Sequence, residues 1–129
     1  MINYGFYKEL NLSFAEVLKQ IPERVKESGF GIVSQLDLKE KFKEKLGIEF
    51  KNYTILGLCD PSSALRSIRT EQNIGLMLPC NMVVFEKDDI TAVSIIKPTI
   101  AMSIIENEKL GLLSHEVETR LNQIFDAIE

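Results

Sequence analysis

The sequence has few of the residues that usually carry chemistry, and it lacks the patterns that direct a chain to nucleic acid or into a membrane. Its 129 residues include two cysteines and one histidine, and the formal net charge is −4. The densest lysine run, residues 39–45, is interleaved with glutamates, which is typical of a solvated helix face. Counterion-release binding to nucleic acid needs a basic patch, so no nucleic-acid partner is expected.

Long apolar runs are also missing. The stretch from residue 90 to 105 is interrupted by Lys97 and Pro98, so no membrane span is predicted. The first residues do not combine a charged region with a long apolar run, so no signal peptide is predicted. Two cysteines without such a signal indicate free thiols in a reducing compartment, and we expect a cytoplasmic protein. The length fits a single domain over residues 1–129, with one hydrophobic core.

Alternating apolar residues and helix-capping signals predict a mixed order of strands and helices. Ser13-x-x-Glu16 and Asp37-x-x-Glu40 are typical of capping boxes, and Asp60-Pro61 combines a favoured N-cap residue with proline at the first helical position. Strands are expected over 2–8, 30–36, 53–58, 81–86 and 90–96. Helices are expected between Ser13 and Gly29, between Asp37 and Gly47, after Asp60, near 99–106 and after Ser114.

The last two strands flank Lys87-Asp88-Asp89, which is a hairpin signal, so they should be antiparallel neighbours. This favours an α+β fold with one sheet and helices packed on one face over a purely parallel, doubly wound sheet. Apolar residues occupy both parities of some strands, as at Val83, Val84 and Phe85. The second face of the sheet should then be partly apolar, and a second copy of the chain would cover it. On the helix after Asp60, we expect Ala64, Leu65 and Ile68 to form the buried face.

Two turns hold the leading candidate site, and they consist of Cys59-Asp60-Pro61 and Pro79-Cys80-Asn81. If the strands that they join are antiparallel neighbours, both thiols lie at one end of the sheet. A helix beginning beside Cys59 would favour its thiolate, which allows a reactive thiol, a redox pair or two ligands of a soft site. The alternative is that both cysteines are small buried hydrophobic residues that shape tight turns.

Weaker candidates lie on the helices. Arg66 and Arg69 share a helix face and could hold an anion, but a solvated helix face is the favoured interpretation. His115 is placed at the first position of the last helix, where the dipole would keep it neutral as a base or ligand; the alternative is an exposed helix start. No spacing typical of a metal site appears, so no metal is predicted.

Several short motifs follow one another in a characteristic order. They are Gly29-Phe30-Gly31-Ile32, Leu46-Gly47, Tyr53-x-Ile55-Leu56-Gly57-x-Cys59-x-Pro61, Ala64 and Gly75-x-x-Leu78-Pro79-Cys80-Asn81. From about residue 13 to the end, the chain resembles the family called domain of unknown function 302 (DUF302). The resemblance implies a fold like that of the TATA-binding protein, which is a curved antiparallel sheet with helices on one face and a β-α-β(4)-α core. It implies frequent homodimers, and a haem-binding role has been suggested for some members. It does not imply DNA binding.

These observations predict a homodimeric module that binds a small ligand or a protein partner near the Cys59 and Cys80 end of the sheet. Two alternatives remain open. One is thiol- or metal-dependent redox activity at the two cysteines, and the other is haem binding. The sequence names no cofactor, and it leaves open whether the protein is an enzyme.

Overall fold

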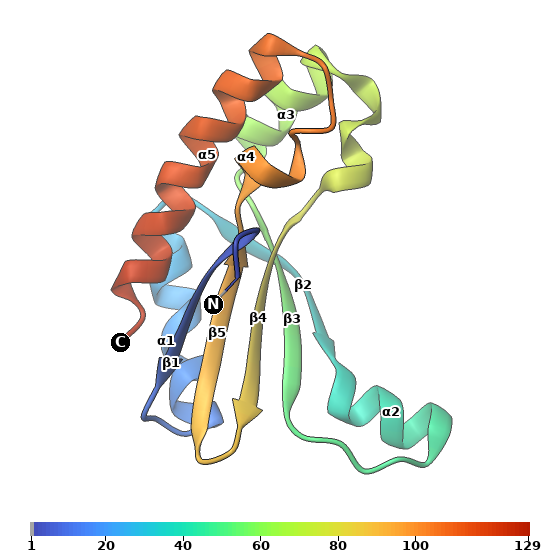
Figure 1. The fold of residues 1–129 in the computed structure, drawn as a ribbon, viewed down its shortest axis with the longest axis vertical. Coiled ribbons are helices and arrows are strands. Elements are labelled where there is room, and N and C mark those ends of the chain that lie inside the picture. Colours follow the sequence, from blue (N-terminus) through green and yellow to red (C-terminus); the bar gives the residue numbers. More distant parts are fainter. Residues whose placement is uncertain (1) are drawn as a thin grey trace.

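Five strands form one antiparallel sheet in the computed structural model, which describes residues 2–129 (Figure 1). The order across the sheet is β1-β5-β4-β3-β2, and every neighbouring pair is antiparallel. The strands are β1 (Gly5–Leu10), β2 (Gly31–Asp37), β3 (Tyr53–Cys59), β4 (Cys80–Lys87) and β5 (Ile90–Ile96). The predicted α+β class and the single antiparallel sheet are therefore confirmed.

The helices surround this sheet unevenly. They are α1 (Phe14–Glu27), α2 (Leu38–Leu46), α3 (Pro61–Thr70), the 3-10 helix η1 (Gln72–Met77), α4 (Pro98–Ala101) and α5 (Glu108–Ala127). Figure 1 shows α1 and α5 along the sheet, α3, η1 and α4 gathered at one end, and α2 projecting at the other. Without α2, α3, η1 and α4, the order is β-α-β(4)-α. Likeness to the TATA-binding protein stays a prediction.

The core lies between the sheet and the two long helices. Apolar residues at helical spacing on α1 and α5 pack against the side chains of β3, β4 and β5 that point toward the helices, as the sequence pattern predicts. The fully buried members are Val17, Ile21, Val25, Leu56, Leu58, Met82, Val84, Val93, Ile95, Leu121, Ile124 and Ile128. The two long helices therefore cover one face of the sheet and leave the other without a helical layer.

The predicted signals at the ends of α1 are confirmed. Ser13 Oγ accepts a hydrogen bond from the Glu16 amide (3.1 Å), and the Glu16 carboxylate accepts one from the Ser13 amide (3.1 Å). Pro22 lies inside the helix on its exposed side and does not end it. Gly29 follows the helix with φ +78°, a left-handed conformation that glycine adopts without strain.

The start of the last helix was predicted wrongly. α5 begins at Glu108, with Asn107 as its N-cap, and the Asn107 side chain accepts a hydrogen bond from the Leu110 amide (3.2 Å). Ser114 is instead buried inside the helix, where its hydroxyl donates to the Gly111 carbonyl (2.8 Å). The additional turns form because Leu110 and Leu113 are buried, and that burial offsets the poor helix propensity of Gly111. His115 therefore lies within α5, and the dipole argument for it is lost.

The buried face of α3 was also predicted wrongly. Leu65 and Ile68 are 49% and 41% exposed, whereas Ser63 and Ser67 are buried. Serine can occupy this face because the Ser67 hydroxyl donates to the Ser63 carbonyl one turn earlier (2.8 Å), which satisfies its polar group inside the helix. Small side chains allow α3 to approach α5 closely. Smaller differences are that the first strand begins at Gly5 and that α4 ends at Ala101.

Candidate functional site

The two cysteine turns lie at the same end of the sheet, as predicted. Leu58 pairs with Cys80 across β3 and β4, and Cys59 is the next residue along β3. Leu58 and Cys80 belong to the core on the helix-covered face. Cys59 pairs with Gly31 as the last residue of β3, and it lines the same small cavity as Leu58 and Cys80. Both cysteines are free thiols.

Neither thiol is activated. Burial raises the pKa of Cys80 to about 11, with a smaller contribution from the neighbouring Cys59. Burial and then the Asp60 carboxylate raise the pKa of Cys59 above its ordinary value. For Cys59, these effects oppose the stabilisation of the thiolate that was expected from the N-terminus of α3. Because the thiolate is the nucleophile and the metal-binding form, this environment does not support the redox or soft-metal alternative.

Both thiols should therefore react slowly with iodoacetamide at neutral pH in the native protein. Unfolding removes the burial that holds both pKa values high, so labelling should become fast in denaturant. Mass spectrometry after timed labelling measures both rates, and the denatured chain is the internal control. Rapid native labelling of either cysteine would contradict this prediction and would restore the reactive-thiol alternative.

The remaining members of the two turns have structural environments. Pro61 is the exposed first residue of α3, and Asn81 is exposed on β4. Pro79 follows a cis peptide bond and its ring lies over Gly57. The structure thus brings all six predicted residues to one end of the sheet, where Cys59, Asp60 and Cys80 line one small cavity and Pro61 and Asn81 are exposed.

A cavity lies beside this end of the sheet, between α3 and α5. Its volume is about 30 Å³, and its lining is mostly apolar, including Phe30, Leu58, Cys80 and Met102. A space of this size holds about one water molecule. Typical ligand pockets have roughly ten times this volume or more. The cavity therefore does not support a bound organic ligand.

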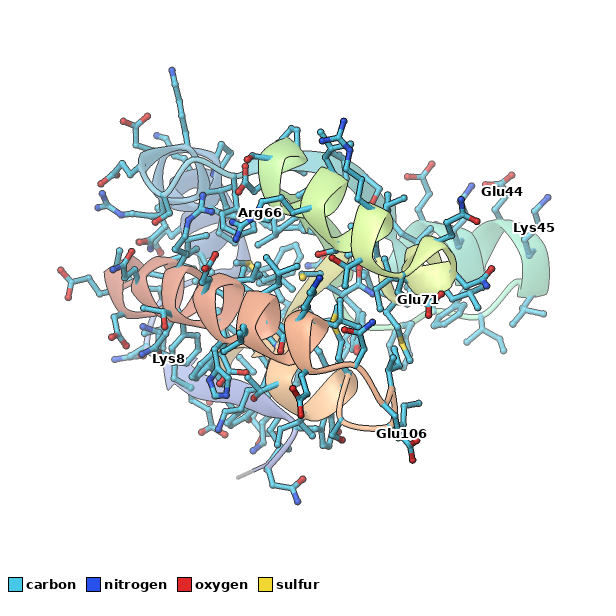
Figure 2. All side chains as sticks on the ribbon, turned by 90° about the horizontal axis from the view of Figure 1, so that it is seen from above. Lys8, Glu44, Lys45, Arg66, Glu71 and Glu106 are labelled. Atoms are coloured by element: carbon cyan, nitrogen blue, oxygen red, sulfur yellow. The ribbon has the colours of Figure 1, made fainter. Side chains whose placement is uncertain are left out.

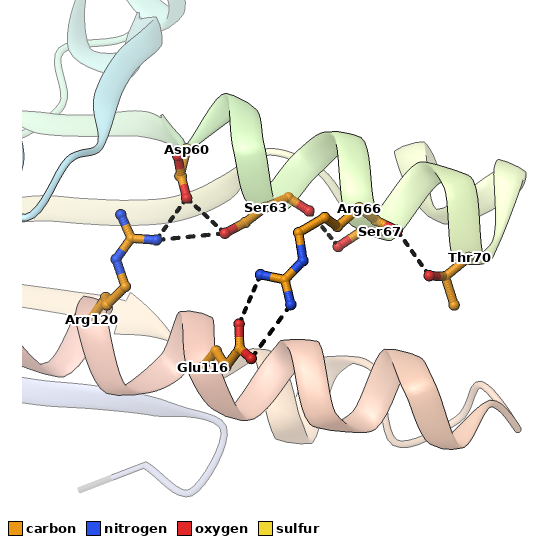
Figure 3. A network of polar contacts seen from close by, with 7 residues as sticks. All are labelled: Asp60, Ser63, Arg66, Ser67, Thr70, Glu116 and Arg120. Carbon is orange, nitrogen blue, oxygen red and sulfur yellow. Dashed lines mark hydrogen bonds and ion pairs between the residues drawn. The ribbon is translucent and has the colours of Figure 1, made fainter.

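Arg120 organises the polar part of this region (Figure 3), and no local sequence pattern indicated it. Its guanidinium donates to Asp60 Oδ2 (2.6 Å) and to the Ser28 carbonyl (2.6 Å), and it lies 4.7 Å from the centre of the Phe30 ring. Ser63 Oγ donates to the same Asp60 oxygen (2.6 Å). Arg120 therefore joins α5 to the start of α3 and to the end of α1.

The position of Asp60 predicted that its side chain would cap α3, but it does not. Its carboxylate instead accepts hydrogen bonds from Ser63 and Arg120. Burial alone would raise the pKa of Asp60. Hydrogen bonds from Ser63 and Arg120, together with the charge of Arg120, outweigh burial and hold that pKa below its usual range. The network thus favours the ionised carboxylate in the folded state.

This lowered pKa predicts a specific response to acid. Because the folded-state pKa of Asp60 lies below its unfolded value, its contribution to stability is present above the unfolded pKa, about 3.9. That contribution is lost as the pH falls through the folded-state pKa. Asp60→Asn should lower the free energy of unfolding at pH 7 by about 1–3 kcal/mol and flatten its decline below pH 4. Urea denaturation at several pH values measures this. Asp88→Asn, in the exposed hairpin turn, should follow the wild type. An equal decline of the free energy of unfolding below pH 4 in all three proteins would contradict the prediction.

The weaker candidates, Arg66, Arg69 and His115, lie outside this network. Arg66 forms a two-pronged ion pair with Glu116 on α5 (3.0 and 3.4 Å), and both side chains are exposed. Arg66, Arg69 and Lys109 line an open groove of about 420 Å³. His115 is exposed on α5. Among residues 2–129, no three His, Cys, Asp or Glu side chains are grouped so that they could hold a metal ion.

A different region carries unexplained apolar surface. We call residues 33–50 the arm; they comprise most of β2, all of α2 and the segment leading to β3. None of residues 38–46, which form α2, is buried. Figure 2 shows Glu44 and Lys45 on α2 far from the body of the molecule. Large apolar side chains of the arm are nevertheless exposed, namely Val33, Leu36, Leu46, Ile48 and Phe50.

These features define a class of protein: an α+β domain with one five-stranded antiparallel sheet, two long helices on one face and a projecting helical arm. The family model described as "Domain of unknown function DUF302" matches residues 6–128. The chain belongs to this family, and the resemblance of its motifs is confirmed.

A solved structure supports this assignment. It is described as the crystal structure of an uncharacterized conserved DUF302 protein from Bacillus stearothermophilus, with a TM-score of 0.91 and 27% sequence identity over 98% of each chain. No curated protein matches the chain. Among residues 2–129, no helix has both the length and the apolarity to span a membrane.

Proposed function

We propose that this domain is a protein-binding module whose arm binds a second copy of the chain. The observation that carries the proposal is that α2 buries none of its residues although it is flanked by exposed apolar side chains. An isolated helix of this length is marginal in water, because a short helix does not recover the cost of its first turn. A partner that covers the arm would supply the missing tertiary contacts.

The exposed apolar area in the arm is large enough to matter. Val33, Leu46 and Ile48 are 61%, 65% and 51% exposed. Fully burying one such side chain contributes roughly 1.5–3 kcal/mol, so covering several of them would offset part of the cost of association. Within the arm, Phe42 and Phe50 pack edge to face, with ring centres 5.2 Å apart, and so hold α2 against the segment that leads to β3.

Charge supports a second copy as the partner. Residues 37–50 contain four lysines, at 39, 41, 43 and 45, and four acids, at 37, 40, 44 and 49, so the segment has no net charge. The whole chain carries −4, so other parts of its surface repel a second copy. A neutral, mixed-charge surface can meet its own copy without net repulsion, whereas a strongly charged partner gains nothing there.

Small-ligand binding near Cys59 and Cys80 has less support, because the adjacent cavity has room for about one water molecule. The redox alternative is disfavoured by the raised thiol pKa values. Haem binding has less support, because His115, the one histidine of the sequence, is an exposed side chain on α5. Self-association through the arm is therefore the function that the geometry favours.

Sedimentation equilibrium should find a dimer for the wild type and a monomer for the double variant Leu46→Glu/Ile48→Glu. The reason is that two carboxylates per chain would have to be buried in the apolar contact. Leu76→Glu/Ile104→Glu is the matched control. It adds the same charge at exposed apolar positions of η1 and the α4–α5 connection, and it should remain a dimer. A monomeric wild type, or equal weakening by both double variants, would refute the proposal.

A further inference from the structure

The outer edge of β2 is the other unusual feature of the arm. β2 is the last strand in the sheet, and within residues 2–129 it pairs only with β3. All of its residues except Ile32 are exposed. In an antiparallel pair, alternate backbone groups point away from the neighbouring strand. The outward amides and carbonyls of β2 therefore form an accessible row that another strand could extend.

The two edges of the sheet differ in how they are protected. The opposite edge, β1, carries Lys8 and Glu9; Lys8 Nζ donates to the Phe125 carbonyl (2.5 Å), and Glu9 forms an ion pair with Lys87 (2.7 Å). Charged residues and prolines are the usual devices that keep an edge strand from pairing with another chain. Within β2, Asp37 at its end is the one charged residue, and the strand contains no proline.

The register of β2 limits where pairing can occur. The ladder with β3 shifts between Ile32 and Ser34, so Val33 is the additional residue of a β-bulge. A bulge interrupts regular pairing, and the stretch from Ser34 to Asp37 is the regular part of the edge. Four residues are a short pairing segment, so this edge needs the arm beside it to bind firmly.

We infer that β2 of a second copy pairs antiparallel with this edge, so that the two sheets join into one and α2 of each copy lies at the end of the joint where β2 of the other copy begins. Self-pairing about a two-fold axis makes a strand antiparallel to its own copy, and each residue of the interface is then used twice. Within the arm, α2 follows β2 directly, so the mixed lysines and glutamates of the neutral segment 37–50 are brought to the same interface. This inference rests on the proposed self-association and specifies its geometry.

Hydrogen–deuterium exchange of the wild type tests the geometry directly. The amides of Ser34 to Asp37 that point away from β3 should exchange slowly when the protein is dimeric, and they should become fast on dilution to monomer. The outward amides of β1 are the internal control and should exchange at the same rate at all concentrations. A dimer whose outward β2 amides exchange fast would overturn this inference while leaving self-association through the arm intact. A wild type that is monomeric at every concentration would overturn both.

Lysine substitutions on the edge of β2 provide the second measurement. Gln35→Lys/Leu36→Lys should raise the dimer dissociation constant at least about tenfold, because the two-fold axis would pass through the stretch from Ser34 to Asp37 and bring the added charges of both copies together. Leu76→Lys/Ile104→Lys adds the same charge far from the edge and should leave that constant unchanged. Circular dichroism checks that both variants are folded. If the edge variant dimerises as tightly as this control, the inference is wrong.

Discussion

Arg120→Ala is expected to lower the free energy of unfolding by about 2–4 kcal/mol. The substitution leaves the Asp60 carboxylate half-buried with Ser63 as its remaining donor, and it leaves the Ser28 carbonyl without its donor from α5. It also removes the guanidinium from the face of the Phe30 ring. Three segments of the chain lose their common contact at once. Urea denaturation followed by circular dichroism measures the loss.

Arg66→Ala is the matched control for this prediction, because it removes the other arginine that joins α3 to α5 (Figure 3). Its ion pair with Glu116 is exposed on both sides, and such pairs contribute at most about 1 kcal/mol. A loss for Arg66→Ala as large as that for Arg120→Ala would show that burial and the shared carboxylate are not the cause.

Gly57→Ala is expected to lower the free energy of unfolding by about 3 kcal/mol. A Cβ atom at this position would stand 2.6 Å from Pro79 Cγ and would also overlap Ser34 Oγ. The serine side chain can rotate away, but the proline ring is attached to the backbone beside Cys80. The sheet must therefore separate locally, or the Pro79-Cys80-Asn81 turn must move. Thermal and urea denaturation would measure the effect.

Gly111→Ala is the control for the glycine substitution. Gly111 lies inside α5 with open space around its Cα, so a methyl group meets nothing within 4 Å. Alanine there should raise the free energy of unfolding by about 0.5–1 kcal/mol, because it removes the entropic cost of glycine in a helix. If both substitutions destabilise equally, the contact with Pro79 is not what requires glycine at position 57.

Most of the fold could be predicted from local signals. The capping box at Ser13, the left-handed glycines after α1 and α2, and the hairpin between β4 and β5 all lie where the pattern placed them. Each of these depends on residues within a few positions of one another, so the sequence alone contains the cause. The two cysteine turns were predicted to share one sheet end on the condition that the strands they join are antiparallel neighbours, and the pairing of β3 with β4 meets that condition.

The wrong predictions share one cause, which is contact between segments that are far apart in the sequence. Nothing near Ser63 indicates that serines are buried, because the reason is the approach of α5 and the Asp60–Arg120 pair, which spans 60 residues. The start of α5 moved because burial of Leu110 and Leu113 outweighed the local signal at Ser114. The same limit applies to the candidate site, where the sequence placed Cys59 and Cys80 together but could not show that burial suppresses their ionisation.

The sequence by itself therefore determined the class of fold and its family, whereas the shared location of the two cysteine turns also needed the pairing of β3 with β4. Only the tertiary structure decided that burial raises the pKa of both thiols, that the cavity beside them is water-sized, and that the arm carries exposed apolar side chains. The physical reason is that strands and caps follow from neighbouring residues, whereas burial, pKa and exposed apolar area depend on which distant parts of the chain cover a residue.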